Sequence, residues 1–212
     1  TRRICLSKKD FYFFNFLDML KDIFMKILLT LFVLLFSSSV FADDISDFEI
    51  EGMSVGDSLL DYFSEEEIIA KIKEGKDDYY WTDQKFVDVY EYKKVKVYER
   101  VSASILRNDK NYIIYSIRGQ LDYEDIDLCL KKQKEIVNDL ESIFNNIKKR
   151  ETKYKYPIDK TGKSMVYRIA FLFDSGDAVD VICLDIAQHM NEPSGLDVAV
   201  SSKKFDVWLN SF

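Results

Sequence analysis

Histidine and proline are almost missing from this sequence, which has one histidine, two prolines and seven glycines in 212 residues. A single histidine excludes a zinc site with three histidine ligands. Any histidine-based acid–base chemistry would depend on His189 alone. A nucleophilic pair of Cys183 and His189 has no catalytic-cysteine or Gly-x-Ser-x-Gly signature around it, so we interpret His189 as a loop residue beside Met190 and Pro193.

Long apolar runs are also scarce, and the one that stands out lies near the N-terminus, from Ile27 to Phe36. Lys26 precedes this run, three serines follow it, and Val40 and Ala42 occupy the positions that a signal peptidase reads. Residues 25–42 are therefore predicted to be a signal peptide, cleaved between Ala42 and Asp43. Residues 1–24 are predicted to be an extension upstream of the true start at Met25.

A membrane anchor is the alternative for this segment. Spanning the hydrocarbon core takes about 20 apolar residues, and this run has half that number. A lipid anchor would need a cysteine after the run, where the chain has Asp43. We therefore expect no stable membrane anchor after cleavage, and a periplasmic or extracellular location.

Basic residues are outnumbered in the predicted mature part, residues 43–212, which carries 24 lysines and arginines, 34 aspartates and glutamates, and a net charge of −10. Such a charge repels nucleic-acid phosphates and anionic lipid, so both are excluded as expected partners. A chain of this size buries an adequate core as a single domain.

Cysteine is rare, and cleavage would remove Cys5, leaving Cys129 and Cys183. In an oxidising compartment an even pair of cysteines is most simply a disulfide. The alternative is two separately buried thiols. We predict the disulfide.

Hydrophobic periodicity divides the mature part into helices and strands. A capping box at Ser64–Glu67 starts a short helix, and residues 84–122 alternate as strands with a turn at 108–111. Residues 123–150 have the spacing of one long amphipathic helix. Strands are predicted at 165–173, 178–186 and 196–200. A terminal helix is predicted to begin after Ser201 or Ser202. The pattern predicts the α+β class: an antiparallel sheet of about five to six strands packed against one long central helix, with short N- and C-terminal helices, all on one face of the sheet.

No catalytic or cofactor motif stands out from this pattern, and no cofactor or metal is expected. The segment Thr161-Gly162-Lys163-Ser164 resembles the end of a phosphate-binding loop, but Pro157 replaces the required glycine and a strand follows. Carboxylates cluster at 122–127, where charge at a helix N-terminus explains them, and Asp174 and Asp177 lack calcium-loop spacing.

Aromatic side chains are abundant in the first sheet region and give the most suggestive functional feature. Tyrosine and tryptophan offer flat apolar faces with a polar edge, which suits binding of a ligand or protein surface. The same residues also serve as ordinary cross-strand pairs. The predicted ligand-binding residues are Tyr80, Trp81, Tyr90 and Tyr92.

The stretch Phe48-Glu49-Ile50-Glu51-Gly52-Met53-Ser54-Val55-Gly56-Asp57-Ser58-Leu59-Leu60 and the Lys/Ile/Asp/Tyr-rich composition resemble those of small, uncharacterised exported proteins of AT-rich marine bacteria. The resemblance implies export and no particular activity. The leading hypothesis is thus a non-enzymatic exported domain that binds an unknown protein or small molecule through one face of its sheet. The alternatives are a carboxylate-dependent hydrolase and a structural component of the cell envelope.

Overall fold

The sheet is the central element of the structure, a computed structural model that describes residues 45–74, 85–91, 95–144 and 147–211. All of these residues belong to one compact unit, Phe41–Phe212. The predicted signal peptide and its cleavage point at Ala42 and Asp43 lie outside the described residues.

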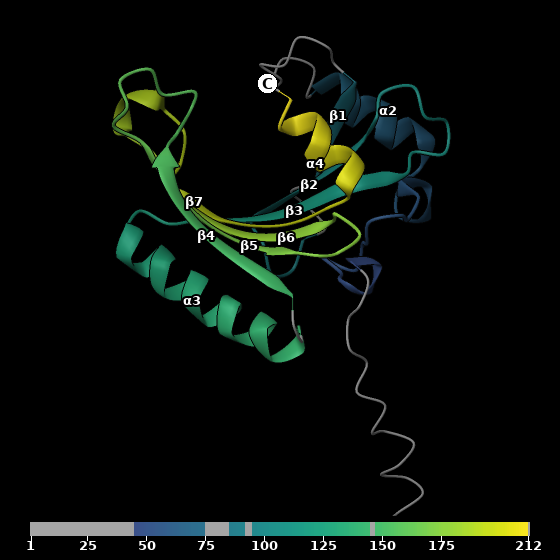
Figure 1. The fold of residues 1–212 in the computed structure, drawn as a ribbon. Helices are drawn as coiled ribbons and strands as arrows, with labels where there is room; N and C mark the ends of the chain where they lie inside the picture. The colour runs from purple at the N-terminus through teal and green to yellow at the C-terminus, as the bar shows by residue number, and fades with distance from the viewer. Residues whose placement is uncertain (1–44, 75–84, 92–94, 145–146, 212) are drawn as a thin grey trace, which may run out of the picture. The chain divides into compact units, whose positions relative to one another are not determined.

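Seven antiparallel strands make up the sheet, in the spatial order β1-β2-β3-β7-β6-β5-β4 (Figure 1). Their bounds are β1 Phe86–Glu91, β2 Arg100–Leu106, β3 Ile114–Asp122, β4 Lys148–Lys155, β5 Met165–Leu172, β6 Ala178–Asp185 and β7 Gly195–Ser201. Two groups of consecutive strands, β1–β3 and β4–β6, are joined by β7, which pairs with β3 on one side and with β6 on the other.

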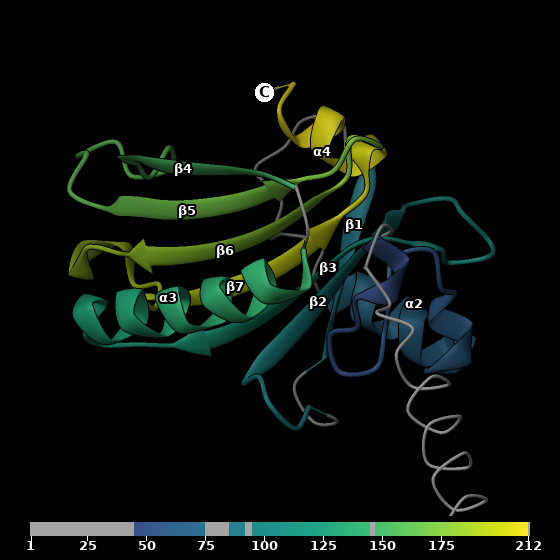
Figure 2. The same ribbon diagram turned by 60° about the horizontal axis from the view of Figure 1, so that its bottom comes forward.

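The long helix α3, Ile126–Ile143, packs against one face of this sheet, across β6 and β7 (Figure 2). The disulfide between Cys129 of α3 and Cys183 of β6 lies in this interface. Because side chains alternate along a strand, the register assigns every strand residue to the α3 face or to the opposite face. Cys183 lies opposite Leu196, and Leu196 opposite Leu121, so these three residues face α3.

The N-terminal part covers the remaining strands, β1–β3, on the same face. It consists of the short helices η1 Ile45–Asp47 and η2 Leu59–Asp61 and the helix α2 Glu65–Glu74. The Ser64 hydroxyl accepts the Glu67 N–H and the Glu67 carboxylate accepts the Ser64 N–H, which is the predicted capping box. Ile68 of α2 is fully buried in the same core as Cys129.

The C-terminal helix α4, Lys203–Leu209, lies on the other, concave face of the curved sheet (Figure 1). Ser202 caps it by accepting the Phe205 N–H. Phe205 and Trp208 pack on Phe86 of β1, with ring centroids 5.2 Å and 5.0 Å away, and form a second, smaller core. Helices therefore cover both faces of the sheet, and the expectation of a single covered face was wrong.

The predicted α+β class with an antiparallel sheet is confirmed, as are the hairpin turns and the Cys129–Cys183 disulfide. The sheet has seven strands instead of five to six. The difference is β4, where the sequence predicted the end of the long helix and then a polar loop. All eight residues of β4 are exposed, so this edge strand carries no apolar alternation by which to recognise it.

Candidate binding site

The predicted aromatic site is only partly described, because Tyr80, Trp81 and Tyr92 lie outside the described residues. Tyr90 is half-buried on β1, on the face opposite α3. The neighbouring tyrosines point to different places: the ring of Tyr98 covers Gly119, the Tyr112 hydroxyl bonds Glu65, and Tyr115 packs edge-on against Phe86. The structure does not bring these described tyrosines together in one patch.

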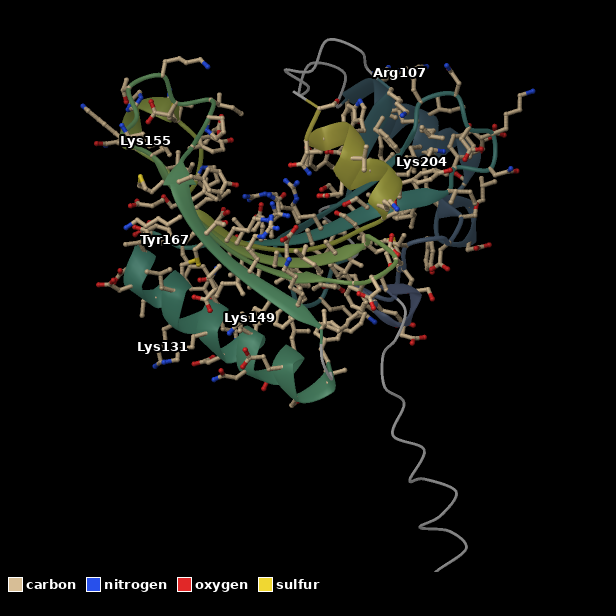
Figure 3. The ribbon with its side chains drawn as sticks, viewed as in Figure 1. Arg107, Lys131, Lys149, Lys155, Tyr167 and Lys204 are labelled. Atoms are coloured by element: carbon tan, nitrogen blue, oxygen red, sulfur yellow. A yellow bond between two sulfur atoms is a disulfide. The ribbon has the colours of Figure 1, made fainter. Side chains whose placement is uncertain are left out.

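A different set of side chains does come together, on the sheet face opposite α3, which we call the polar face. Four charged residues of inner strands lie there, Arg118, Arg168, Asp180 and Asp197, because all four alternate away from α3. Nitrogen-bearing side chains gather on this side of the sheet, between α4 and the sheet end that carries Lys155 (Figure 3).

The first centre on the polar face is formed around Asp197 of β7, and we call it the Asp197 centre. A guanidinium nitrogen of Arg118 lies 3.7 Å from the Asp197 carboxylate, and the Gln120 amide donates to it at 3.2 Å. Asp197 is 7% exposed in its side chain and Arg118 is 38% exposed. A buried carboxylate is thus held beside a guanidinium that solvent can reach.

Tyr156, from the loop between β4 and β5, completes the Asp197 centre. Its hydroxyl donates to Glu192 at 3.4 Å. Burial, and then the charge of Glu192, raises the pKa of Tyr156 to about 12, and the charges of Arg118 and Asp197 also act on this phenol. The centre therefore combines side chains from β3, β7 and two loops.

The second centre, the Asp180 centre, pairs Asp180 of β6 with Arg168 of β5. The guanidinium of Arg168 binds both carboxylate oxygens, at 2.7 Å and 2.8 Å, and Asp206 of α4 lies 4.0 Å from the same guanidinium. Such two-point geometry is the strongest form of this ion pair. Asp180 and Asp197 are diagonal neighbours on adjacent strands, because Asp180 lies opposite Ala199 and Asp197 lies opposite Ile182.

Burial raises the pKa of both carboxyl groups, since a charge is poorly solvated in the interior. The guanidiniums of Arg168 and Arg118, respectively, act in the opposite direction and favour the ionised form. Carboxyl groups with raised pKa values beside cations are typical of functional sites, although ion-pair networks share this property.

Asp159, in the β4–β5 loop at the rim of the polar face, accepts several hydrogen bonds with its carboxylate. Its carboxylate accepts the hydroxyls of Thr161 and Ser164 at 2.7 Å and lies 3.1 Å from Nε2 of His189 in η4, Gln188–Met190. The hydrogen bonds from Thr161, and then those from Ser164, lower the pKa of Asp159. The phosphate-loop-like segment 161–164 thus wraps around a carboxylate.

Ser164, His189 and Asp159 do not form a catalytic triad. The Ser164 hydroxyl is fully buried, donates to Asp159 and accepts the backbone N–H of Ala187. His189 contacts the same Asp159 carboxylate and Thr161, so no base is placed on the serine. We interpret these hydrogen bonds as a structural link between the β4–β5 loop and the β6–β7 connection.

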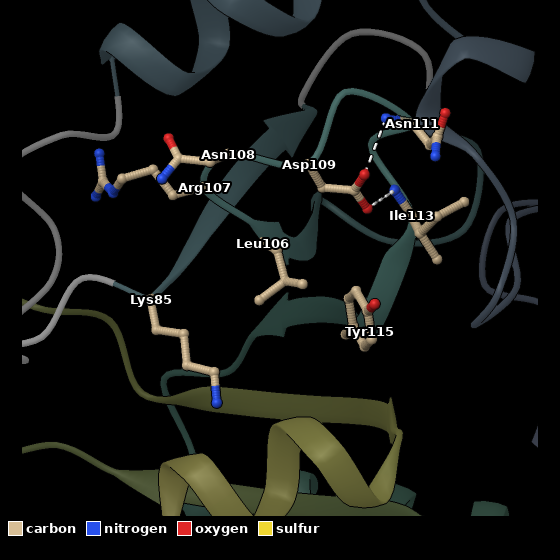
Figure 4. A pocket seen from close by; sticks show the side chains of 8 residues that line it. All are labelled: Lys85, Leu106, Arg107, Asn108, Asp109, Asn111, Ile113 and Tyr115. Atoms are coloured by element: carbon tan, nitrogen blue, oxygen red, sulfur yellow. Dashed lines mark hydrogen bonds between the residues drawn. The ribbon is translucent and has the colours of Figure 1, made fainter.

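A separate open hollow of about 1030 Å³ lies at the β2–β3 turn and is lined by Lys85, Leu106, Arg107, Asn108, Asp109, Asn111, Ile113 and Tyr115 (Figure 4). The Asp109 carboxylate accepts the backbone N–H groups of Asn111 and Ile113 and so shapes the turn. The hollow therefore lies at the predicted hairpin turn.

The other predicted carboxylates also have local roles. Asp125 caps α3 by accepting the N–H of Asp127, and Asp177 accepts the N–H of Lys203. Within the described ranges, no three His, Cys, Asp or Glu side chains are grouped so as to hold a metal ion. No helix in the same part of the chain combines the length and hydrophobicity needed to cross a membrane.

Comparison with known proteins gives no further guide to the site: no family model matches the chain, and neither the curated proteins nor the solved structures contain a match.

Sequence reasoning missed the polar face. The usable pattern was a charge in the middle of an apolar strand, as in Val179-Asp180-Val181 and Leu196-Asp197-Val198. A single charge of this kind marks a strand position that is paired or functional, because unpaired burial is costly.

Proposed function

We propose that the mature chain is an exported binding domain that takes a polar small molecule, or a polar group of a partner protein, on the polar face at the Asp197 centre. The observation that carries this proposal is the convergence of Arg118, Asp197, Gln120 and Tyr156 from separate strands and a loop.

Stability alone gives a poor reason for such an arrangement. Removing a charge from water costs several kcal/mol, and apolar residues of similar volume often stabilise a fold as well or better. Asp197 is 5% exposed, so its carboxylate pays this desolvation cost. A role in holding the Arg118 guanidinium in place for a ligand would explain why the buried carboxylate is kept.

Export is the second half of the proposal. It rests on the predicted signal peptide at residues 25–42 and is supported by the disulfide, since such bonds persist in oxidising compartments.

Ligand retention tests the binding function. The exported protein would be dialysed against the low-molecular-weight fraction of an extract of the producing cells and weighed intact by native mass spectrometry. We expect a retained ligand on the wild type and on the control Arg107→Gln, which changes an arginine in the β2–β3 turn. The double variant Arg118→Gln/Asp197→Asn, which removes both charges and keeps hydrogen-bonding groups, should retain none. An unliganded wild type, or equal retention by all three proteins, would contradict the proposal.

Carboxylate-dependent hydrolysis is a second candidate, favoured by the raised pKa values of two diagonal neighbours, Asp180 and Asp197. A protonated carboxyl and an ionised one can act as the acid and base of glycoside hydrolysis. The test is release of nitrophenol from a panel of nitrophenyl glycosides. Hydrolysis that survives both Asp180→Asn and Asp197→Asn, or no hydrolysis by the wild type, would reject this candidate.

A further inference from the structure

We infer that β4 is a second binding surface, which takes an acidic, extended segment of a partner protein as an added strand at the edge of the sheet. Strand β4 lies at the opposite end of the strand order from β1. Lys149 and Lys155 mark its two ends in Figure 3. The surface is separate from the Asp197 centre, so this inference does not depend on the proposed function.

The β4–β5 hairpin, residues 148–172, has a charge opposite to that of the rest of the mature part. It contains eight lysines and arginines and two acidic residues, a net charge of +6. The remaining residues of the mature part carry −16. Charges more than a Debye length apart, about 8 Å at physiological ionic strength, are largely screened from each other. A short acidic segment at this edge therefore meets mainly the positive charge of the hairpin.

The side chains of β4 form two rows, because they alternate across the strand. Lys153 lies opposite Tyr167, and its Nζ is 4.6 Å from the centroid of that ring. Tyr167 lies opposite Cys183, so the odd-numbered row of β4 is on the α3 side. Lys149 of this row is paired with Glu141 of α3 at 2.6 Å. The even-numbered row lies on the side of the polar face.

Lys148 and Arg150 of the even-numbered row are the cations most available to a ligand. Both are exposed, and in the described part of the chain the side chain of neither forms an ion pair or a hydrogen bond. They are two positions apart, which is about 7 Å along a strand. Carboxylates at alternate positions of an extended peptide have the same spacing. Opposite charges on neighbouring strands stabilise their pairing.

The backbone of β4 favours a peptide over other anions. Part of the N–H and C=O groups of an edge strand point away from its one partner and remain unpaired. Strand β4 pairs with β5 in one continuous register, contains no proline, and is not the strand that α3 covers. Its lysines keep neutral and basic strands from pairing there, but they attract an acidic strand. Nucleic acids and lipids lack the alternating donors and acceptors that would pair with this edge.

The test is fluorescence anisotropy of labelled, end-blocked peptides titrated with the exported protein. The first peptide alternates glutamate with threonine. The second has the same length and charge but alternates glutamate with proline, which removes N–H donors and prevents pairing in a sheet. We expect the first peptide to bind, more weakly as the salt concentration rises. The second should bind more than about tenfold more weakly, because it cannot make the backbone hydrogen bonds.

The double variant Lys148→Glu/Arg150→Glu reverses the charge of the two available cations. It should lose about tenfold or more in affinity for the glutamate–threonine peptide, because two attractive cross-strand pairs become repulsive. The control Lys110→Glu/Lys134→Glu makes the same change in net charge at two exposed lysines outside the hairpin and should bind like the wild type. Melting temperatures establish that both variants are folded.

Absence of binding by the wild type, or an equal loss in the control variant, would overturn the inference. Equal binding of the glutamate–proline peptide would overturn strand addition, because side-chain charge alone would then account for the affinity. Tighter binding of oligothymidylate, or of phosphatidylglycerol vesicles, than of the glutamate–threonine peptide would overturn the acidic peptide as the ligand class.

Discussion

Asp197 has a carboxyl group that is nearly inaccessible to water, in a strand whose seven residues are all buried. Burial raises its pKa above the ordinary value of 3.8, and the cation of Arg118 offsets part of this shift. Between the ordinary pKa and the raised one, the folded protein holds a proton that the unfolded chain has released. Stability contributed by this group therefore falls as the pH rises through that window.

Asp197→Asn should remove this dependence, because asparagine has nearly the same shape and does not ionise. We expect the free energy of unfolding of the wild type to fall more steeply than that of the variant as the pH rises from about 4 towards 7. Urea unfolding at a series of pH values measures the difference. Parallel curves for the two proteins would show that Asp197 ionises in the folded state as readily as in the unfolded chain.

Arg168 should matter more to stability than any exposed lysine. Arg168→Gln leaves the buried Asp180 without its two-point partner, and removing one member of a buried pair costs about 3–5 kcal/mol. Adding Asp180→Asn should recover most of the loss. Lys132→Gln breaks an exposed pair with Glu135 and serves as the control, with an expected change below about 1 kcal/mol. Chemical denaturation of the wild type, these three variants and Asp180→Asn alone measures these differences, and additive effects of the Arg168 and Asp180 substitutions would argue against coupling.

At the residue scale the sequence could identify strand-embedded charges but not their partners. Arg118 and Asp197 are 79 positions apart and meet because β3 and β7 are neighbours in the sheet. Nothing in the local pattern of either strand specifies that pairing. The tyrosines were the more visible feature in the sequence, yet Tyr98, Tyr112 and Tyr115 each have a local packing or hydrogen-bonding role.

Helix α3 is attached to the sheet by one polar side chain as well as by its apolar stripe. The amide of Gln133, 4% exposed, donates at 2.8 Å to the backbone oxygens of Tyr167 on β5 and of Val181 on β6. Gln133→Ala should lower the free energy of unfolding by about 1–3 kcal/mol, because these bonds are lost and a cavity remains. Lys134→Ala, exposed on the same helix, should change it little. Equal melting temperatures for the two variants would contradict this role.

The disulfide fixes the same helix covalently. It closes a loop of 54 positions between Cys129 and Cys183, and such a loop contributes about 4 kcal/mol in the chain-entropy model. We expect the double variant Cys129→Ala/Cys183→Ala to unfold at lower urea concentration than the wild type. Reductant should lower the urea concentration at which the wild type unfolds and should leave that of the variant unchanged. A variant as stable as the oxidised wild type would show that packing alone holds α3.

Periodicity predicted the helices and inner strands because one side of each is apolar and faces a core. The end of α3 and the whole of β4 were beyond this method. Strand β4 has no buried residue and five basic residues in eight positions, a composition that protects a sheet edge from pairing with other chains. Its partner β5 determines its conformation, so only the assembled sheet reveals it.

At the scale of the whole molecule, the proposed export predicts a defined mature form. We expect protein recovered from outside the cytoplasm to begin at Asp43 and to contain the oxidised cysteine pair. N-terminal sequencing and intact mass, compared with and without alkylation after reduction, measure both features. A protein that keeps residues 25–42, or that carries two free thiols, would contradict the expectation.

Strand β7 has a consequence for how the chain reaches its folded state. Strands β1–β3 and β4–β6 can each form from neighbouring segments, but Ser116 of β3 pairs with Ser201, 85 positions later. Contacts so distant in sequence close slowly. Arg118 lies on β3 and Asp197 on β7, so a ligand held between them would slow the separation of these two strands. Backbone amides of β3 and β7 should then exchange with deuterium more slowly in the liganded protein, while those of the β1 edge exchange as before.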